Sequence, residues 1–260
     1  MDDRLLIESE GFTYLQSSTL MADRLPLGPK DVHIWRVSLN QPRPTIEKLQ
    51  QILSQDEQAR GHRFHFEKDR QHFVVARASL RTLLARYLKS APTDIQFTYA
   101  RHGKPELPTS FSRGQPLHFN LSHSGNFALY AFTYVGEIGV DLEQIRPEFT
   151  GDDIARRFFS ENEIASLTRI PAELRHEAFF NCWTRKEAFI KAKGIGLSLA
   201  LDQFDVSLTP NEPTALLRTR WDEHEASRWS LKEINVDPGY AAAVAVAGHD
   251  WELTCFELEV

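Results

Sequence analysis

The sequence runs through one series of predicted elements twice, and this repetition constrains the fold more than any other feature. A serine followed by acidic residues, a common helix start, occurs in 53–61 (LSQDEQARG) and again in 159–167 (FSENEIASL). Each copy precedes a long helical pattern, in 70–88 and in 175–194. The repetition predicts two halves of similar plan.

Strand-like runs follow each long helical pattern. The first runs after the helices are 95–100 and 202–208, and later come the paired apolar runs 129–135 with 137–143 and 240–248 with 251–260. We therefore expect an α/β (α+β) fold of two subdomains, residues 1–136 and 137–260, each a helix packed on a mainly antiparallel sheet. The seam between such halves is a natural ligand cleft. The Pro- and Gly-containing stretch 101–116 is expected to be a loop.

Composition limits the class of protein. The chain has 260 residues, 42% apolar and 25% charged, which is an ordinary globular balance. A net charge of -6 and a pI near 5.9 argue against a broad nucleic-acid surface. The two cysteines, Cys182 and Cys255, lie far apart and outside any zinc-type spacing, so we read them as buried thiols in a reducing compartment.

No segment is predicted to direct the chain to a membrane. The start, MDDRLLIESEGF, lacks the apolar run of a secretory signal. The most apolar segment, 240–248, is about half as long as a membrane-spanning helix. We expect a cytoplasmic protein without a membrane span.

Two carboxylates lie one residue apart in the strand-like stretch 138–144 (IGVDLEQ). Successive strand side chains point to opposite faces, so Asp141 and Glu143 share one face. Their mutual repulsion is relieved by water, by a shared proton or by a bound cation. A hard divalent ion is one reading, and a strand end exposed to solvent is the other.

A second informative stretch is 183–198 (WTRKEAFIKAKGIGLS). On a helix, Trp183, Glu187 and Lys191 are spaced i, i+4, i+8 and lie along one face. Ordinary ion pairing on a helix surface would give the same pattern. The glycines at 194–196 are expected to end the helix and to let a ligand come close.

A third stretch, 118–132 (HFNLSHSGNFALYAF), is an apolar strand interrupted by small and polar residues. Ser122 and His123 precede Gly125 in a predicted turn whose donors suit an anion. The alternative is a histidine that is hydrogen-bonded only locally.

Together these stretches resemble the 4'-phosphopantetheinyl transferase superfamily, in particular its long, two-domain class typified by surfactin-synthetase activators. The features that carry the resemblance occur in order: GKP at 103–105, FNLSHSG at 119–125, GVDLE at 139–143, RFFS at 157–160 and WTRKEAFIKAKGIGLS at 183–198. The resemblance covers most of the chain. It implies a pseudo-twofold pair of α/β halves with coenzyme A between them.

The resemblance also implies a reaction. The phosphopantetheine arm of coenzyme A passes to a serine of an apo acyl or peptidyl carrier protein of fatty acid, polyketide or nonribosomal peptide synthesis, and 3',5'-ADP is released. Asp141, Glu143 and Glu187 are implied to bind Mg²⁺, with Mn²⁺ as an alternative, which suits a metal that prefers oxygen ligands. Lys191 is the implied cation near the leaving side, and Glu187, or a metal-bound water, the base.

For the rest of coenzyme A, the resemblance implies a phosphate contact from Ser122 and His123, with Arg60 and Lys104 near the nucleotide end. Without that context, the two basic residues could be plain solvated charges. One departure concerns position 57, where relatives may carry a basic residue and this chain has glutamate. Unless His62 or Arg63 replaces that charge, we expect a more weakly held 3'-phosphate. Trp183 is interpreted as packing.

Two other classes compete with this reading. A Mg²⁺-dependent nuclease or phosphodiesterase could use a D-x-E pair with a distant glutamate, but it usually has a more basic surface. An inactive relative that only binds carrier proteins would be expected to lose one of the four residues Asp141, Glu143, Glu187 and Lys191, and all four are present. We expect a monomer with no nucleic-acid or membrane partner.

Overall fold

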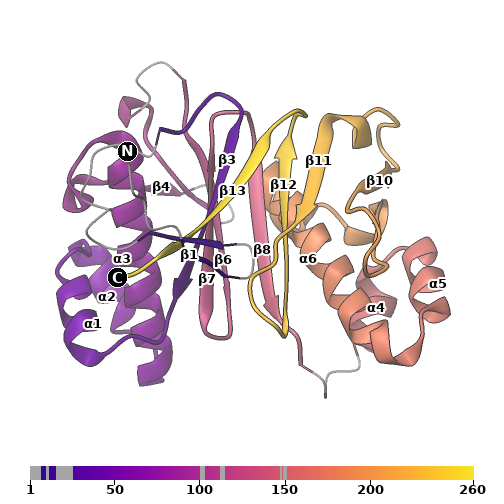
Figure 1. Ribbon diagram of the computed structural model, residues 1–260, viewed down its shortest axis with the longest axis horizontal. Helices are drawn as coiled ribbons and strands as arrows, with labels where there is room; N and C mark the ends of the chain where they lie inside the picture. Colours follow the sequence, from indigo (N-terminus) through magenta and orange to yellow (C-terminus); the bar gives the residue numbers. More distant parts are fainter. Residues whose placement is uncertain are drawn as a thin grey trace.

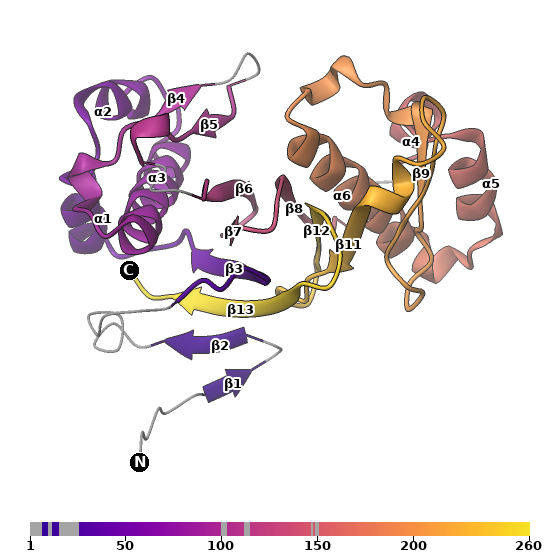
Figure 2. The same ribbon diagram turned by 90° about the horizontal axis from the view of Figure 1, so that it is seen from above.

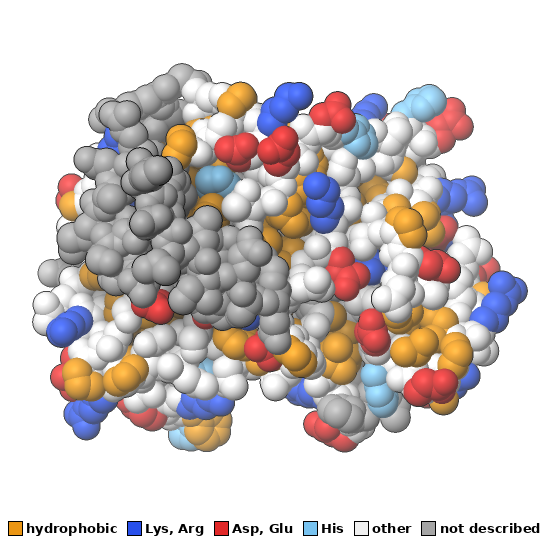
Figure 3. Space-filling view, viewed as in Figure 1, with side chains coloured by type: hydrophobic (Ala, Val, Ile, Leu, Met, Phe, Trp, Pro, Cys, Tyr) orange, Lys and Arg blue, Asp and Glu red, His pale blue; other side chains and the backbone are white. Residues whose placement is uncertain are grey.

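The computed structural model describes residues 7–9, 12–15, 26–99, 103–111, 115–146, 148 and 151–260. Figure 1 shows strands in the middle of the molecule, with α1, α2 and α3 on one side and α4, α5 and α6 on the other. The arrangement confirms the expected mixed α/β fold with mainly antiparallel sheets. Figure 3 shows acidic and basic side chains interspersed over the described part of one face.

The helices begin where the sequence predicts. Helix α2 (Gln55–Gly61) starts after Ser54, whose backbone N–H donates to Glu57, and α5 (Glu161–Arg169) starts after Ser160 with the same arrangement to Glu163. The other helices are α1 (Arg43–Gln50), α3 (Glu67–Leu88), α4 (Asp152–Phe158) and α6 (Arg175–Lys193). Short 3-10 turns are η2 (Pro92–Asp94), η3 (Thr109–Phe111), η4 (Ala172–Leu174), η5 (Gly196–Ser198), η6 (Leu201–Gln203) and η7 (Ala226–Arg228).

Two main sheets support these helices. The larger has the order β1-β2-β13-β3-β7-β6 and the smaller β11-β12-β8. Strand bounds in the larger sheet are β1 (Ile7–Ser9), β2 (Phe12–Leu15), β3 (Asp31–Ser38), β6 (His118–Ser124), β7 (Phe127–Thr133) and β13 (Glu252–Leu258). Those in the smaller are β8 (Ile138–Gln144), β11 (Trp229–Glu233) and β12 (Tyr240–Ala247). Two short hairpins join β4 (Thr98–Tyr99) to β5 (Pro105–Glu106) and β9 (Phe204–Val206) to β10 (Leu216–Thr219).

The grouping of the apolar runs suggested that 251–260 pairs with 240–248, but the two runs do not pair in the structure. Strand β12 is bordered by β8 and β11, so it offers no free edge. Strand β13 instead pairs in parallel with β3 and with β2. The division at residue 136 remains a prediction. Strand β13 belongs to the second predicted subdomain by sequence but lies in the sheet formed by strands of the first.

The remaining expected strands are shorter than their sequence patterns. Of 95–100, only Thr98–Tyr99 is a strand, and residue 100 lies outside the described residues. Of 202–208, Phe204–Val206 is a strand that follows a 3-10 turn. The predicted loop 101–116 also contains the short strand β5 and the turn η3; residues 101–102 and 112–114 lie outside the described part.

Three apolar clusters hold the layers together. One lies between α3 and the larger sheet and another between α6 and the smaller sheet. The third joins the two sheets directly, with Ile34 and Leu129 on one side and Val140 and Val244 on the other. No helix in the described part of the chain is both long enough and apolar enough to span a membrane.

The two sheets meet at β6 and β8, which Figure 2 shows side by side between the two groups of helices. Backbone N–H groups of β8 here donate to side chains of β6 and not to its backbone carbonyls. The backbone N–H of Val140 donates to Asn120 Oδ1 at 3.0 Å, and that of Gln144 donates to Ser124 Oγ at 3.1 Å. This junction fixes β8 relative to the end of β6, which carries His123.

Candidate active site

A cleft of about 640 Å³ lies between α3 of one half and α6 of the other. Its wall includes five of the residues predicted to form the site, which come from both halves: Arg60, Lys104, His123, Glu187 and Lys191. A cavity of this size is within the range of sites for small molecules and cofactors. The predicted seam thus contains a cleft lined by these five residues, whereas Ser122, Asp141 and Glu143 are not part of its wall.

The two carboxylates of β8 both face β6. Asp141 accepts a hydrogen bond from Ser122 Oγ at 2.9 Å, and Glu143 accepts one from Ser124 Oγ at 2.8 Å. The alternation of strand side chains predicts this shared face. Asp141 is buried, with a side chain only 5% exposed, so the pair is not a strand end in solvent.

Lys191 bridges α6 to this pair of strands. Its ammonium donates to Asp141 Oδ1 at 2.6 Å, to Ser122 Oγ at 2.9 Å and to the carbonyl of Val140 at 3.4 Å. Glu187 lies one turn earlier on α6 and lines the cleft. The ion pair of Lys191 with Asp141 of β8 therefore lies within the second half, and the hydrogen bond of Lys191 to Ser122 of β6 crosses the seam.

The electrostatics of the site favour an added positive charge. Burial, and next the charge of Asp141, raise the pKa of Glu187 and the pKa of Glu143 above the ordinary carboxylate value. Lys191 lowers both, but the net shift of each pKa is upward. The carboxylates repel one another more than the single ammonium compensates.

Comparisons with known proteins agree on one family. Residues 35–134 match the model described as "4'-phosphopantetheinyl transferase, N-terminal", and residues 137–245 match that of the 4'-phosphopantetheinyl transferase superfamily. The transferase HetI of Nostoc sp. is 41% identical over 228 residues, which are 88% of this chain and 92% of that protein. The chain belongs to the 4'-phosphopantetheinyl transferase superfamily.

Further relatives carry the same enzyme name. The 4'-phosphopantetheinyl transferase Sfp of Bacillus subtilis is 32% identical over 205 residues, 79% of this chain and 87% of that protein. Among solved structures, the holo-[acyl-carrier-protein] synthase of Thermotoga maritima matches at 22% identity with a TM-score of 0.36, over 44% of this chain and 64% of that one. The sequence relatives confirm the predicted family.

The three predicted metal ligands of this transferase are all carboxylates, which are suitable ligands for a hard cation. Asp141 Oδ2 is buried and has no hydrogen-bond partner in the part of the chain that the structure describes. Carboxylate oxygens are what Mg²⁺ prefers, and Asp141, Glu143 and Glu187 are the residues that would hold it. Within the described residues, however, no three His, Cys, Asp or Glu side chains are already gathered closely enough to hold a metal ion. In this structure the ammonium of Lys191 supplies the positive charge beside Asp141.

The turn after His123 is held by the other half of this transferase. Gly125 has φ of 57°, and a Cβ there would meet the hydroxyl of Tyr240 and the side chain of Gln144. The backbone N–H of Asn126 donates to the same Tyr240 hydroxyl at 3.1 Å. The side chain of His123 is exposed to the cleft. The surrounding protein partly removes water from its ring, and this desolvation, followed by the charge of Lys191, lowers the pKa of His123. Ser122 and His123 thus lie in β6 and not in the predicted turn, which consists of Gly125 and Asn126, and His123 is exposed near the end of the strand, where an anion can approach.

Lys104 reaches across the seam instead of standing free in solvent. Its ammonium donates to the backbone carbonyl of Lys191 at 2.8 Å, at the end of α6. Burial lowers the pKa of Lys104, and the negative charges of Glu106 and Glu137 partly offset this shift. Arg60 lies over the ring of Phe73 at 5.5 Å and remains exposed at the cleft wall. Both basic residues thus have defined positions at the cleft.

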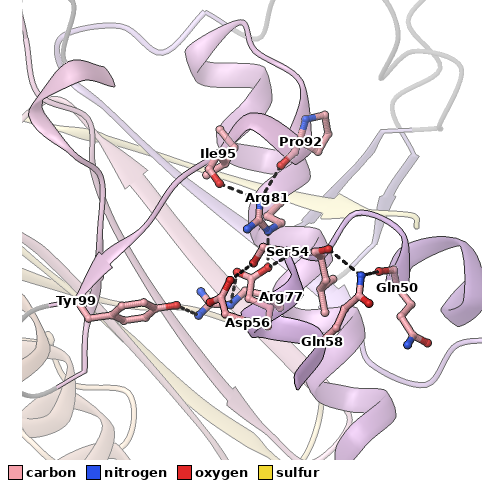
Figure 4. Close-up of polar contacts among 11 residues, drawn as sticks. Gln50, Ser54, Asp56, Gln58, Arg77, Arg81, Pro92, Ile95 and Tyr99 are labelled. Atoms are coloured by element: carbon pink, nitrogen blue, oxygen red, sulfur yellow. Dashed lines mark hydrogen bonds and ion pairs between the residues drawn. The ribbon is translucent and has the colours of Figure 1, made fainter. Parts of the chain in front are cut away.

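Glu57 does not place a negative charge in the cleft. It is only 2% exposed, and its carboxylate pairs with Arg77 Nε at 3.1 Å and with Arg81 Nε at 2.6 Å. Figure 4 shows the two arginines of this network, with Arg77 donating to Tyr99 and Arg81 to backbone carbonyls. The negative charge of Glu57 is therefore compensated inside the protein, while the expected weaker hold on the 3'-phosphate remains a prediction.

Arg63 does add basic charge beside Arg60. The two arginines line an adjoining cavity of about 600 Å³ together with Asp56, Phe64 and Tyr99. Sequence reasoning missed His72 and Arg77, which line the main cleft from α3. A signal existed, because Arg77 and Arg81 lie four residues apart in an otherwise apolar stretch of helix, which indicates buried charges that need a partner.

Trp183 packs, as the sequence suggests. Its ring lies 5.9 Å from that of Phe158, edge to face, and 6.4 Å from that of Phe179 in a stacked arrangement. It belongs to the apolar cluster between α6 and its neighbouring elements. This packing supports the helix that carries Glu187.

Proposed function

We propose that this member of the superfamily transfers the 4'-phosphopantetheine arm of coenzyme A to a serine hydroxyl of an apo acyl or peptidyl carrier protein and releases 3',5'-ADP. One observation carries the proposal: a single cleft at the seam combines basic side chains from the N-terminal part with an acidic and a basic side chain of α6. The names of the relatives HetI and Sfp support the same activity.

The proposed metal is Mg²⁺, or Mn²⁺ in its place, held by Asp141, Glu143 and Glu187. The partnerless oxygen of Asp141 and the raised pKa values of the two glutamates support it. Bound there, the metal would supply positive charge for a diphosphate and acidify a nearby hydroxyl.

The residues of the chain have separate proposed roles. His123 and Arg60 bind the 3'-phosphate and nucleotide end, with Ser122 supporting the turn, and Lys104 contributes positive charge beside them. The carrier serine oxygen forms a bond to the phosphorus that bears the pantetheine arm, and the bond from this phosphorus to the oxygen bridging to the nucleotide breaks. Glu187 takes the serine proton, and Lys191 neutralises the charge that develops on the departing 3',5'-ADP.

Other parts of the proposal concern the molecule as a whole. The two family models divide between residues 134 and 137, which supports subdomains 1–136 and 137–260. We also propose a monomer located in the cytoplasm, with no nucleic-acid or membrane partner.

The test is modification of a carrier. The purified protein is incubated with Mg²⁺, coenzyme A and a panel of apo-carriers, and intact-mass spectrometry measures the gain of one phosphopantetheine. We expect Glu187→Gln to reduce turnover on the order of a hundredfold or more, because it removes both a ligand charge and the base. Glu177→Gln, the same change elsewhere on α6, is the matched control. Carriers that gain no mass, or near-normal turnover of Glu187→Gln, would refute the proposal.

A further inference from the structure

The ammonium of Lys191 has all its hydrogen-bonding capacity engaged at Asp141 and its neighbours. A lysine ammonium has three N–H donors. Three acceptors lie around this one: Asp141 Oδ1, Ser122 Oγ and the carbonyl of Val140. The group that we propose as a phosphate partner is therefore already bound inside the protein.

The ammonium and a divalent cation cannot both occupy this position at low energy. A metal on Asp141 would lie a few ångströms from the ammonium, and two positive charges that close repel strongly away from bulk water. Asp141 Oδ2, which has no hydrogen-bond partner among the described residues, belongs to the same carboxylate that Lys191 holds. Metal binding at Asp141 therefore requires Lys191 to move.

We infer that Lys191 is a placeholder for the metal and that its release by coenzyme A couples the binding of the two. This inference rests on the proposed function. Without coenzyme A, Lys191 neutralises Asp141 and opposes the metal. When a diphosphate enters the cleft, it attracts the ammonium, and Asp141 becomes available to the metal.

The surroundings allow this exchange without moving the helix. Lys104 holds the backbone carbonyl of Lys191, so the end of α6 stays in place. The Lys191 side chain is 29% exposed and lines the cleft, whereas that of Asp141 is 5% exposed. Rotation of one lysine side chain is therefore sufficient. By thermodynamic linkage, the metal must strengthen coenzyme A binding by the same factor as coenzyme A strengthens metal binding.

The experiment measures Mn²⁺ binding by titration calorimetry and by the electron paramagnetic resonance of free Mn²⁺, at neutral pH without carrier protein. Wild type and Lys191→Met are compared with and without coenzyme A. Breaking a charged hydrogen bond corresponds to about tenfold to a hundredfold in an equilibrium constant, so Lys191→Met should bind Mn²⁺ tighter by about that factor when coenzyme A is absent. Coenzyme A should then raise the Mn²⁺ affinity of this variant much less than that of wild type.

Controls separate this inference from the proposed metal site. Lys193→Met removes a lysine of the same helix whose partner is Glu225, outside the cleft, and should leave Mn²⁺ affinity unchanged. Asp141→Asn should abolish the gain in the Lys191→Met background. Lys191→Gln and Lys191→Ala test the same prediction if the methionine variant does not fold.

Each outcome has one meaning. Tighter Mn²⁺ binding by the lysine variants supports the placeholder. Equal Mn²⁺ affinity of wild type and the variants overturns it and leaves the metal site standing. Absence of Mn²⁺ binding by every protein, with and without coenzyme A, overturns both the placeholder and the metal part of the proposed function.

Discussion

Replacing Lys186 by methionine should destabilise the protein severely, although the residue lies outside the cleft. Lys186 is fully buried, and its ammonium donates to the carbonyls of Leu201 and Phe204 at 2.7 and 2.6 Å. Its ion partner at 2.8 Å is Glu163, which is 2% exposed. Glu163 also accepts the backbone N–H of Ser160, so one carboxylate joins the start of α5 to the middle of α6.

The expected loss follows from what methionine leaves behind. It fills the volume of the lysine stem, but the carboxylate of Glu163 stays buried without its counter-charge. Removing one partner of a buried pair typically costs about 3–5 kcal/mol. At roughly 2–4 °C per kcal/mol for a chain of this size, the melting temperature should fall by about 6–20 °C.

The assay is urea unfolding followed by circular dichroism, with thermal melts in parallel. The double variant Lys186→Met with Glu163→Gln should recover part of the loss, because it no longer buries an unpaired charge. Lys193→Met should lose less, since Lys193 is partly exposed and Glu225 keeps Arg228 and Trp229 as partners. A loss below about 1 kcal/mol in Lys186→Met, or a double variant no more stable than the single one, would refute the reasoning.

Three further predictions concern the end of β6, the core and the packing of α6 on β8. His123→Ala should weaken binding of coenzyme A more than binding of coenzyme A lacking its 3'-phosphate; equal losses in calorimetry would place His123 elsewhere. Burial lowers the pKa of His33 from 6.5 to about 4. On acidification the unfolded chain therefore binds a proton at this histidine before the folded protein does. The free energy of unfolding should fall by about 3 kcal/mol as the pH drops from 6.5 to about 4. His33→Gln should lack that component in urea titrations at neutral and acidic pH, and an identical pH dependence would contradict it. Gly139→Ala should push α6 from β8, since the new Cβ would meet the backbone of Ala188 and Ala192; melts as stable as wild type would show that the helix can shift.

Local patterns in the sequence predicted local structure well. The serine-plus-acid starts at Ser54 and Ser160 mark real helix starts, because the serine and the acid three residues later satisfy backbone groups within a few residues. The alternation in 138–144 correctly placed Asp141 and Glu143 on one face. The ordered motifs also identified the family and most of the cleft residues, although what each residue does there remains proposed.

Partners distant in the sequence were not predictable in the same way. Periodicity shows which face a strand buries and says nothing about which strand lies beside it, so the place of β13 was missed. The sequence likewise gives the charge of Glu57 but not its burial between Arg77 and Arg81. Lys191 was expected at a phosphate, and its bond to Asp141 depends on how closely α6 packs on β8.

The position of β13 has a consequence for how the chain acquires its structure during synthesis. In the sheet order, β13 lies between β2 and β3, so an inner strand of this sheet is synthesised long after the strands on either side of it. Until residues 252–258 emerge, the edge of β3 that they cover has no partner, and uncovered strand edges readily recruit strands of other chains. The nascent N-terminal part should therefore be the segment most dependent on chaperones, and its sheet becomes complete only after the smaller sheet and α6 have been synthesised.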